Sequence, residues 1–163
     1  MLHKYGMDDV PAALTPSLLG LFAEKSDRKL LGPADKRDYQ AVNGILNHPM
    51  STRFDLLLEI GHLCSRNQNP TVADRKKQIQ VLRYLKAFPD LGPVYSAKPG
   101  PIELVGSSDA SHAVLVDGSS HTGHTIAIWY GGLVNAPFTA VSVAERSSVS
   151  PDAMSAEYKS LGP

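Results

Sequence analysis

The sequence predicts an α+β fold in which a helical segment is followed by an antiparallel sheet. Between residues 35 and 88, apolar residues recur at helical spacing, and prolines interrupt the runs. From Gly92 onward the composition shifts to Pro, Gly, Ser, Val and Thr, and short alternating or β-branched runs typical of strands follow. We therefore place a domain boundary within residues 91–100 and expect two domains, 1–95 and 96–163.

Composition limits the class of protein. With 163 residues the chain is long enough to bury a hydrophobic core, and its 16 basic and 16 acidic residues balance, so attraction to nucleic acid requires a local basic patch. A single cysteine, Cys64, excludes an intramolecular disulfide. No apolar run approaches the roughly 20 residues of a membrane helix, and the N-terminus does not resemble a signal peptide. We expect a soluble, intracellular protein, cytoplasmic or nuclear, with no membrane partner.

Helical spacing predicts three helices after an irregular N-terminal arm formed by the first 33 residues. The first helix begins near Asp35 and ends before Pro49. The third begins after the cap residue Thr71 and ends before Pro89. The apolar positions predicted for these two helices are Tyr39, Val42 and Leu46 in the first, and Val81, Leu82, Leu85 and Phe88 in the third.

The second predicted helix, within residues 51–70, is apolar around most of its circumference and should be largely buried. Its one polar stripe is formed by Asp55, Glu59 and His62, at spacings of four and three residues. Such a stripe has the geometry of a carboxylate and histidine metal site, but a solvated helix face is the simpler interpretation, and we favour it. One apolar face is expected to contain Phe54, Leu57, Leu58, Gly61 and Cys64.

The second half of the sequence predicts strands and then a final helix. Ser150 and Pro151 are the residue types of a helix cap and of a first helical position, so a helix should follow the strands. A turn rich in Gly, Ser and His separates the first two long strands. The strands are predicted as a short one near Val94 and three long ones at residues 102–107, 125–130 and 138–143.

Two carboxylates in this half are candidates for chemistry. Asp109 is expected just past the end of the first long strand, and Glu157 about two turns into the final helix, beside the small residues Ser155 and Ala156. If that helix packs across the sheet, these small residues allow close approach, and the two carboxylates can meet. Paired carboxylates on rigid elements suit Mg²⁺, which takes oxygen ligands. From the pattern alone, a turn aspartate and a solvated glutamate remain the simpler interpretation.

The order of the segments resembles a known family. The stretch "SSDASHAVLVDGSSHTGHTIAI", followed by "SSVSPDAMSAEYKSL", resembles the opening of the ribonuclease H domain in copia-type retrotransposon polyproteins, where an aspartate ends the first strand and Ala-Glu-Tyr lies on the first helix. Upstream, "YQAVNGIL", "TRFDLLLEIGHLCSRNQNPT" and "QVLRYLKAFPDLGPVY" resemble, in the same order, that family's linker between polymerase and ribonuclease H. The resemblance extends from Met1 to Leu161.

The resemblance implies a helical connection segment in residues 1–95 and a truncated ribonuclease H-like antiparallel sheet with one C-terminal helix in residues 96–163. It also implies hydrolysis of the RNA strand of RNA–DNA hybrids with two metal ions, Mg²⁺ or Mn²⁺. Asp109 and Glu157 match the catalytic metal ligands. The family's further aspartates lie downstream of this helix, so we expect an incomplete active site that is inactive alone.

Departures from the family pattern leave a second hypothesis open. "DASHAV" lacks the aromatic residue that the family usually has near the first aspartate, and "SVAERSSVS" lacks its lysine-rich stretch. The alternative is a domesticated, non-catalytic module that binds nucleic acid or is a structural subunit of a larger assembly. The expected partners are an RNA–DNA hybrid or other nucleic acid, and the remainder of the polymerase or a larger complex.

Basic residues of the third predicted helix form a candidate nucleic-acid contact. At about 100° per residue, four of them fall within an arc of roughly 100°, which Ile79 interrupts. Such an arc can follow a phosphate backbone, although an ordinary exposed helix face has the same pattern. The four residues are Arg75, Lys76, Arg83 and Lys86.

Three histidines, His112, His121 and His124, lie close together around the predicted turn. Tetrahedral zinc needs a fourth ligand, often a cysteine, and the sequence has none nearby. We interpret the three as loop histidines on a solvated edge, with His112 and His124 as candidates to lie beside the phosphates of a hybrid. Ser111 and His112 do not form a convincing nucleophile and base with any third residue.

Overall fold

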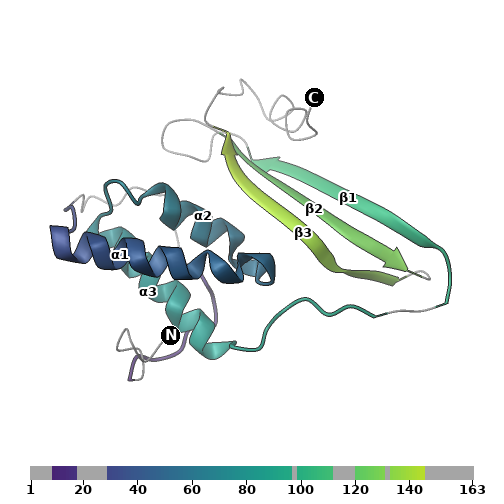
Figure 1. The fold of residues 1–163 in the computed structure, drawn as a ribbon, viewed down its shortest axis with the longest axis horizontal. Coiled ribbons are helices and arrows are strands. Elements are labelled where there is room, and N and C mark those ends of the chain that lie inside the picture. Colours follow the sequence, from purple (N-terminus) through teal and green to yellow (C-terminus); the bar gives the residue numbers. More distant parts are fainter. Residues whose placement is uncertain (1–8, 18–28, 97–98, 112–119, 131–132, 146–163) are drawn as a thin grey trace. The chain divides into compact units, whose positions relative to one another are not determined.

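The computed structural model describes residues 9–17, 29–96, 99–111, 120–130 and 133–145. In these residues three α-helices precede three β-strands (Figure 1). The predicted α+β class, a helical segment followed by an antiparallel sheet, is therefore confirmed. The helix predicted after the strands lies outside the described residues.

The chain divides into two compact units. The helical unit comprises Met1–Met50 and Leu58–Leu91, and the sheet unit comprises Ser51–Leu57 and Gly92–Pro163. The short segment before the second helix thus belongs with the sheet, although helices flank it in the sequence.

Local sequence signals set the bounds of two helices. Helix α1 spans Pro33–Leu46 and begins with a proline, which is favourable at the first helical position because its missing N–H would have no partner there. Helix α3 spans Val72–Ala87 and begins with a capping box. In that box the Asp74 amide donates to Thr71 Oγ1 (3.1 Å), and the Thr71 amide donates to Asp74 Oδ2 (2.9 Å).

The second predicted helix is shorter and divided. Two 3-10 turns, η2 at His48–Ser51 and η3 at Phe54–Leu56, precede helix α2, which spans Leu57–Ser65. The apolar residues that become fully buried are Leu56, Ile60 and Leu63. The face predicted from Phe54, Leu57, Leu58, Gly61 and Cys64 stays partly exposed.

The helical core takes apolar side chains from α1 and α3. The side of α3 that becomes buried is rotated from the predicted one: Tyr84 is buried, whereas Leu85 and Phe88 remain half-exposed. The Tyr84 ring lies 5.0 Å from the Phe88 ring, which shields it. The predicted apolar residues that are buried are Tyr39, Val42, Leu46, Val81 and Leu82.

A hydrogen-bond network crosses this core. The fully buried Gln78 donates from Nε2 to Asn43 Oδ1 (2.6 Å) and to the backbone carbonyl of Tyr39 (2.9 Å). Asn43 Nδ2 (3.1 Å) and the Tyr39 hydroxyl (2.8 Å) both donate to the Leu63 carbonyl. That carbonyl belongs to the last turn of α2, and it also accepts from the Arg66 amide (3.1 Å). Two side chains of α1 therefore donate hydrogen bonds to the C-terminal turn of α2.

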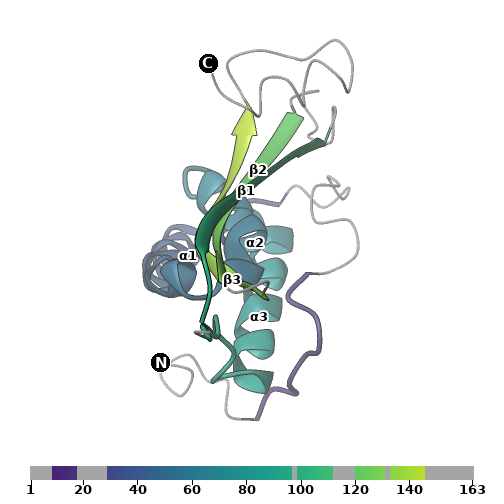
Figure 2. The same ribbon diagram turned by 90° about the vertical axis from the view of Figure 1, so that its right-hand side faces the viewer.

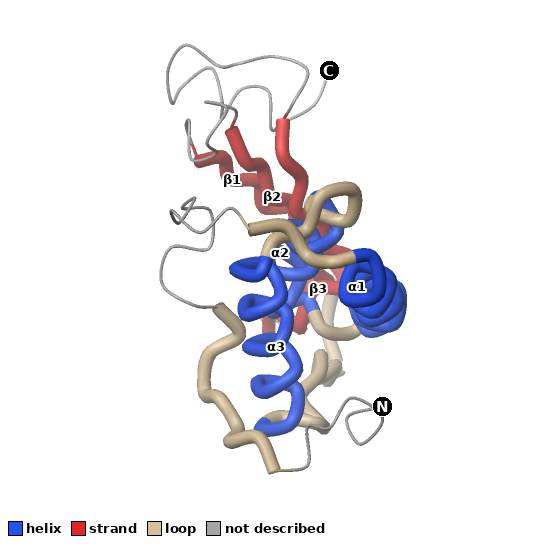
Figure 3. The backbone as a smooth tube through the Cα atoms, turned by 90° about the vertical axis from the view of Figure 1, so that its left-hand side faces the viewer, coloured by secondary structure: helices blue, strands red, loops and turns tan. Residues whose placement is uncertain are grey.

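Residues 9–17, called the arm below, contain no helix or strand, as predicted for the N-terminal region. Figures 2 and 3 show the arm running beside α3; it is purple in Figure 2. Ala13 is its buried residue, with 7% of its surface exposed, and the Ala13 amide donates to the Arg83 carbonyl (3.1 Å). The arm is thus packed against one helix.

The sheet consists of β1 (Ile102–Ser111), β2 (Ser120–Tyr130) and β3 (Leu133–Glu145), antiparallel and in the order β1-β2-β3. Figure 2 shows the twist of the three strands. Each strand is longer than predicted, because cross-strand pairing continues into the residues expected to form turns. The strand predicted near Val94 is wrong: residues 91–96 form no strand, and Val94 is 75% exposed.

The register places Asp109 opposite Gly123 in β2, and Gly123 opposite Ser142 in β3. It shifts around Ala127, which pairs with Pro137. Proline lacks the N–H that a ladder uses, so it is tolerated on edge strands and at such irregularities.

One face of the sheet exposes apolar side chains. Residues directly opposite each other on neighbouring strands share a face, and Leu104 with Ile128 and Gly106 with Ile126 are such pairs. We call this surface the apolar sheet face. Its strongly exposed members are Ile102 (64%), Leu104 (70%), Ile126 (39%) and Val141 (44%).

Candidate functional site

Asp109 lies within β1, two residues before its end, and its side chain is exposed. The prediction that the strand stops before Asp109 is wrong. Backbone pairing with β2 continues as far as Ser111 opposite His121, although serine and alanine have little strand preference of their own. Asp109 Oδ1 accepts a hydrogen bond from the Ala110 amide (2.9 Å), which orients the carboxylate.

The register determines which side chains share the Asp109 face. Ser111 follows two residues later in β1, and its cross-strand partner His121 is a diagonal neighbour of Asp109. Directly opposite stands Gly123, which has no side chain, and beyond it Ser142 in β3. Asp109 is therefore surrounded on this face by hydroxyls and one imidazole.

His121 is the neighbour that the sequence interpretation missed as part of this site. It lies in β2, so the expectation of a loop histidine is wrong. His121 Nε2 and Ser142 Oγ are 2.6 Å apart, and burial lowers the pKa of the His121 ring. The only available signal was the alternation of side chains between the two faces of a strand. Once the hairpin register is known, this alternation places His121 and Asp109 on one face.

His124 lies on the opposite face. Its Nδ1 is 3.1 Å from Ser108 Oγ, its direct cross-strand partner. The structure therefore separates His124 from Asp109, and it also separates His124 from His121, which excludes a zinc site shared by those two side chains within the sheet. His112 lies outside the described residues.

The described residues do not by themselves form a site for Mg²⁺ or Mn²⁺. Mg²⁺ is bound by carboxylates with octahedral geometry. Around Asp109, however, the described part of the sheet provides hydroxyls and an imidazole. Within the described ranges, no group of three or more His, Cys, Asp or Glu side chains could hold a metal ion. Glu157 lies outside them, so its pairing with Asp109 stays a prediction.

Two residues of the polar stripe in the second predicted helix are buried, contrary to our expectation of a solvated face, whereas Asp55 is exposed. Glu59 is 6% exposed and His62 is 7% exposed. Ser17 of the arm donates to Glu59 Oε1. Asp55 lies in η3, outside α2, and its carboxylate accepts two hydrogen bonds from Arg53, at 3.0 and 2.9 Å. A residue distant in the sequence, Ser17, thus provides a partner that allows the burial of Glu59.

His62 has a second buried neighbour, Lys77 of α3. His62 Nε2 and Lys77 Nζ are 3.2 Å apart, and Lys77 Nζ is 3.9 Å from Asp74 Oδ1. A protonated lysine has donors and no acceptor, so beside it His62 Nε2 must be the unprotonated ring nitrogen. This arrangement joins α2 to α3 with polar contacts.

The basic residues predicted on α3 differ in their surroundings. Lys76 is exposed, and Arg75 donates to Gln78 Oε1 (2.5 Å). Arg83 Nε donates to the Pro11 carbonyl (2.6 Å), and Lys86 Nζ donates to the Val10 carbonyl (3.0 Å). Half of the predicted patch thus holds the backbone of the arm.

Membrane insertion finds no support in the helices that the structure describes, because none of them is both long and apolar enough to cross a bilayer.

Comparison with known proteins gives one similarity. No family model matches the sequence, and no solved structure matches it. Over 86 residues, 53% of this chain, the sequence is 33% identical to an uncharacterized mitochondrial protein of Arabidopsis thaliana, AtMg00810. The matched segment covers 35% of that protein, so the chain spans about a third of the length of its relative.

Proposed function

We propose that the chain is part of a copia-type retroelement polyprotein, covering the connection between polymerase and ribonuclease H and the beginning of the ribonuclease H domain. The ordered series of motifs is the observation that carries this proposal. Two findings support it: a helical unit precedes an antiparallel sheet whose first strand bears Asp109, and a longer plant mitochondrial protein is similar over 86 residues.

The parent activity in this proposal is two-metal hydrolysis of RNA in RNA–DNA hybrids. Asp109 and Glu157 are the proposed carboxylate ligands of Mg²⁺ or Mn²⁺. Asp109 is suited to this role because it is exposed, fixed in a strand, and opposite a glycine that leaves space beside the carboxylate. Because only two carboxylates of the resembled family, Asp109 and Glu157, have counterparts in this sequence, we propose that this chain alone does not cleave RNA.

Contact with nucleic acid is the second part of the proposal. The basic residues of α3 would follow the phosphate backbone of a hybrid, and His112 and His124 would lie beside phosphates from the sheet. Lys76 supports this because it is exposed on α3. The proposed contacts on α3 are Arg75, Lys76, Arg83 and Lys86.

A non-catalytic subunit of a larger assembly is the alternative, and the apolar sheet face favours it. Leu104 is 70% exposed and Ile102 is 64% exposed on the same face. Contiguous exposed apolar patches mark surfaces that other protein segments cover. The remainder of the polymerase or another subunit would provide that cover.

The first experiment measures Mn²⁺ binding and cleavage of a labelled RNA–DNA hybrid. It compares the chain with Asp109→Asn and with the matched control Glu103→Gln, which removes an exposed carboxylate six residues earlier on the same face of β1. We expect weak Mn²⁺ binding that Asp109→Asn abolishes and Glu103→Gln leaves unchanged, without cleavage.

Each other outcome has a distinct meaning. Equal Mn²⁺ binding in all three proteins would contradict the assignment of Asp109 as a ligand. Cleavage that depends on Asp109 would identify the chain as a complete enzyme. Co-purification in a stable complex, with neither metal binding nor cleavage, would favour the structural subunit.

A further inference from the structure

We propose that the arm, residues 9–17, is an internal competitor that occupies the phosphate-binding positions of Arg83 and Lys86. The inference rests on the proposed contact between α3 and nucleic acid, and it adds the regulation of that contact. When the arm is displaced, Arg83 and Lys86 would be available to phosphate together with the other basic residues of α3. When the arm is docked, these two side chains would be occupied.

The geometry of the two basic side chains supports the competition. Arg83 Nε donates to the Pro11 carbonyl at 2.6 Å, and Lys86 Nζ donates to the Val10 carbonyl at 3.0 Å. The same N–H groups bind phosphate oxygens in nucleic-acid complexes, because a phosphate and a backbone carbonyl both offer oxygen lone pairs. As long as the arm is docked, these N–H groups are engaged, so a phosphate that uses the same N–H groups replaces the carbonyls of the arm.

The arm is held mainly through its backbone. Besides the two basic contacts, Gln80 Nε2 donates to the Thr15 carbonyl (2.8 Å), and the Ala13 amide donates to the Arg83 carbonyl (3.1 Å). Ala13 is a small buried residue, whereas its neighbour Leu14 is 81% exposed. Ser17 of the arm also donates to Glu59 Oε1. These contacts are polar, and a ligand with stronger charge can replace those that Arg83 and Lys86 make.

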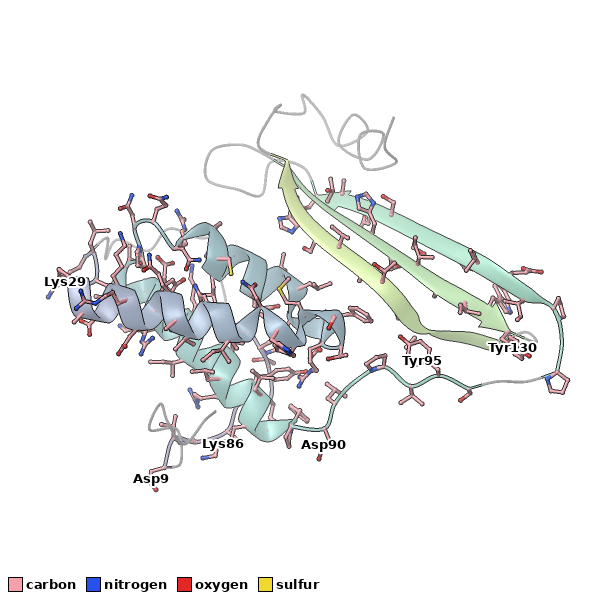
Figure 4. All side chains as sticks on the ribbon, viewed as in Figure 1. Asp9, Lys29, Lys86, Asp90, Tyr95 and Tyr130 are labelled. Carbon is pink, nitrogen blue, oxygen red and sulfur yellow. The ribbon has the colours of Figure 1, made fainter. Side chains whose placement is uncertain are left out.

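Charge favours that exchange. A phosphate carries a full negative charge and forms stronger hydrogen bonds with Arg and Lys than a neutral carbonyl does. The arm also brings the exposed Asp9, which precedes Val10, the residue whose carbonyl accepts from Lys86. Figure 4 labels Asp9 and Lys86. A carboxylate there weakens the attraction of α3 for phosphate as long as the arm is docked. The arm does not contact the other two basic residues in this way. Lys76 is exposed to solvent, and Arg75 donates to Gln78.

The test releases the arm without changing a basic residue. In Ala13→Gln, a longer side chain replaces a buried methyl and should displace the arm, whereas Leu14→Gln introduces the same residue at an exposed position. Hydrogen exchange of the residue-13 amide reports arm release. Anisotropy of a fluorescein-labelled RNA–DNA hybrid, measured across a KCl series, reports binding by the full chain and by both variants.

We expect Ala13→Gln to bind the hybrid several-fold more tightly at low salt and to lose protection at amide 13. Two additional phosphate contacts should steepen the slope of log K against log [KCl] by roughly two. Leu14→Gln should match the unchanged chain. Adding Arg83→Gln and Lys86→Gln to Ala13→Gln should remove the gain, and a synthetic peptide of residues 9–17 should compete with the hybrid for Ala13→Gln.

Two results would overturn the proposal in different ways. If amide 13 loses protection but hybrid binding and its salt slope do not change, the arm is not a competitor, although the nucleic-acid contact stands. If neither the chain nor Ala13→Gln binds any hybrid, the proposed nucleic-acid function fails and the regulation fails with it. If Ala13→Gln does not fold, the same measurements are made on Gln80→Met. This variant removes the hydrogen bond to the Thr15 carbonyl and so also loosens the arm.

Discussion

Gln78 in α3 donates a 2.6 Å hydrogen bond to the side-chain carbonyl of Asn43 in α1, and both side chains are fully buried. Neither amide could be buried alone at low cost, because a buried polar group without a partner loses its hydration and gains nothing. Asn43 also donates to the Leu63 carbonyl of α2 (3.1 Å). The three helices are thus aligned by directional contacts, and apolar packing alone would not fix their registration.

Replacing Gln78 with leucine should destabilise the helical unit. The change removes the donor to Asn43 Oδ1 and a second donor to the Tyr39 carbonyl, which keeps its helical partner inside α1. The buried Asn43 Oδ1 left without a donor costs about 1–3 kcal/mol. The free energy of unfolding from urea titration measures the loss. The exposed Gln68→Leu should change it by less than about 0.5 kcal/mol, and equal effects of the two variants would contradict our account.

The capping box of α3 should contribute measurable stability. Thr71→Ala removes the acceptor for the Asp74 amide and should lower the free energy of unfolding by about 1 kcal/mol, whereas Thr71→Ser keeps a hydroxyl and most of the stability. Urea unfolding followed by circular dichroism measures both variants. A Thr71→Ser variant as unstable as Thr71→Ala would show that the methyl group, rather than the cap, is what matters.

Tyr39 should resist ionisation. Burial raises the pKa of its phenol well above the ordinary value of about 10, so the folded protein holds this proton more tightly than the unfolded chain does. Its contribution to stability is therefore complete below about pH 10 and is lost as the pH rises beyond it. In an alkaline titration at 295 nm, the Tyr39 component should ionise only as the helical unit unfolds. Tyr39→Phe should remove that late component.

His121 should titrate below the ordinary pKa of histidine. Burial lowers the pKa of its ring below about 6.5, so between the folded and unfolded values the unfolded chain binds more protons. The stabilising contribution of neutral His121 is complete above about pH 6.5 and is lost as the pH falls towards the folded pKa. NMR titration of the ring should give a midpoint below 6.5. The decrease in unfolding midpoint between pH 7.5 and pH 5 should be smaller in His121→Gln than in His124→Gln.

Local signals in the sequence predicted the helical part of the fold well. Helix α1 begins at Pro33, two residues before the predicted start, and ends before Pro49 as predicted. Helix α3 follows Thr71 and ends before Pro89, because these signals act within one helical turn. The burial of Glu59 and His62 could not be predicted in that way, because their partners, Ser17 and Lys77, come from segments distant in sequence. From the sequence alone, such a polar stripe is interpreted as a solvent-exposed face, because the segments that cover it are not known.

The site was predicted less completely than the fold. The role of Asp109 stays a prediction, and its place inside β1 depends on pairing with β2 and not on the preference of its own neighbours. Register also decides which histidine accompanies it: His121 shares its face and His124 does not. A register shift of one residue would place His124 on the Asp109 face and His121 on the other, and the amino-acid composition does not reveal the register.

Because of Pro137, the two edge strands of the described sheet, β1 and β3, differ in how readily they can pair with another strand. On β3 this proline and the neighbouring register shift interrupt the row of backbone donors. Over its described length β1 contains no proline, and its residues pair with β2 without a break from Ile102 to Ser111. Edge-to-edge self-association, in a concentrated sample or in a misfolded one, is therefore directed to the β1 border, next to the carboxylate that the proposed chemistry needs.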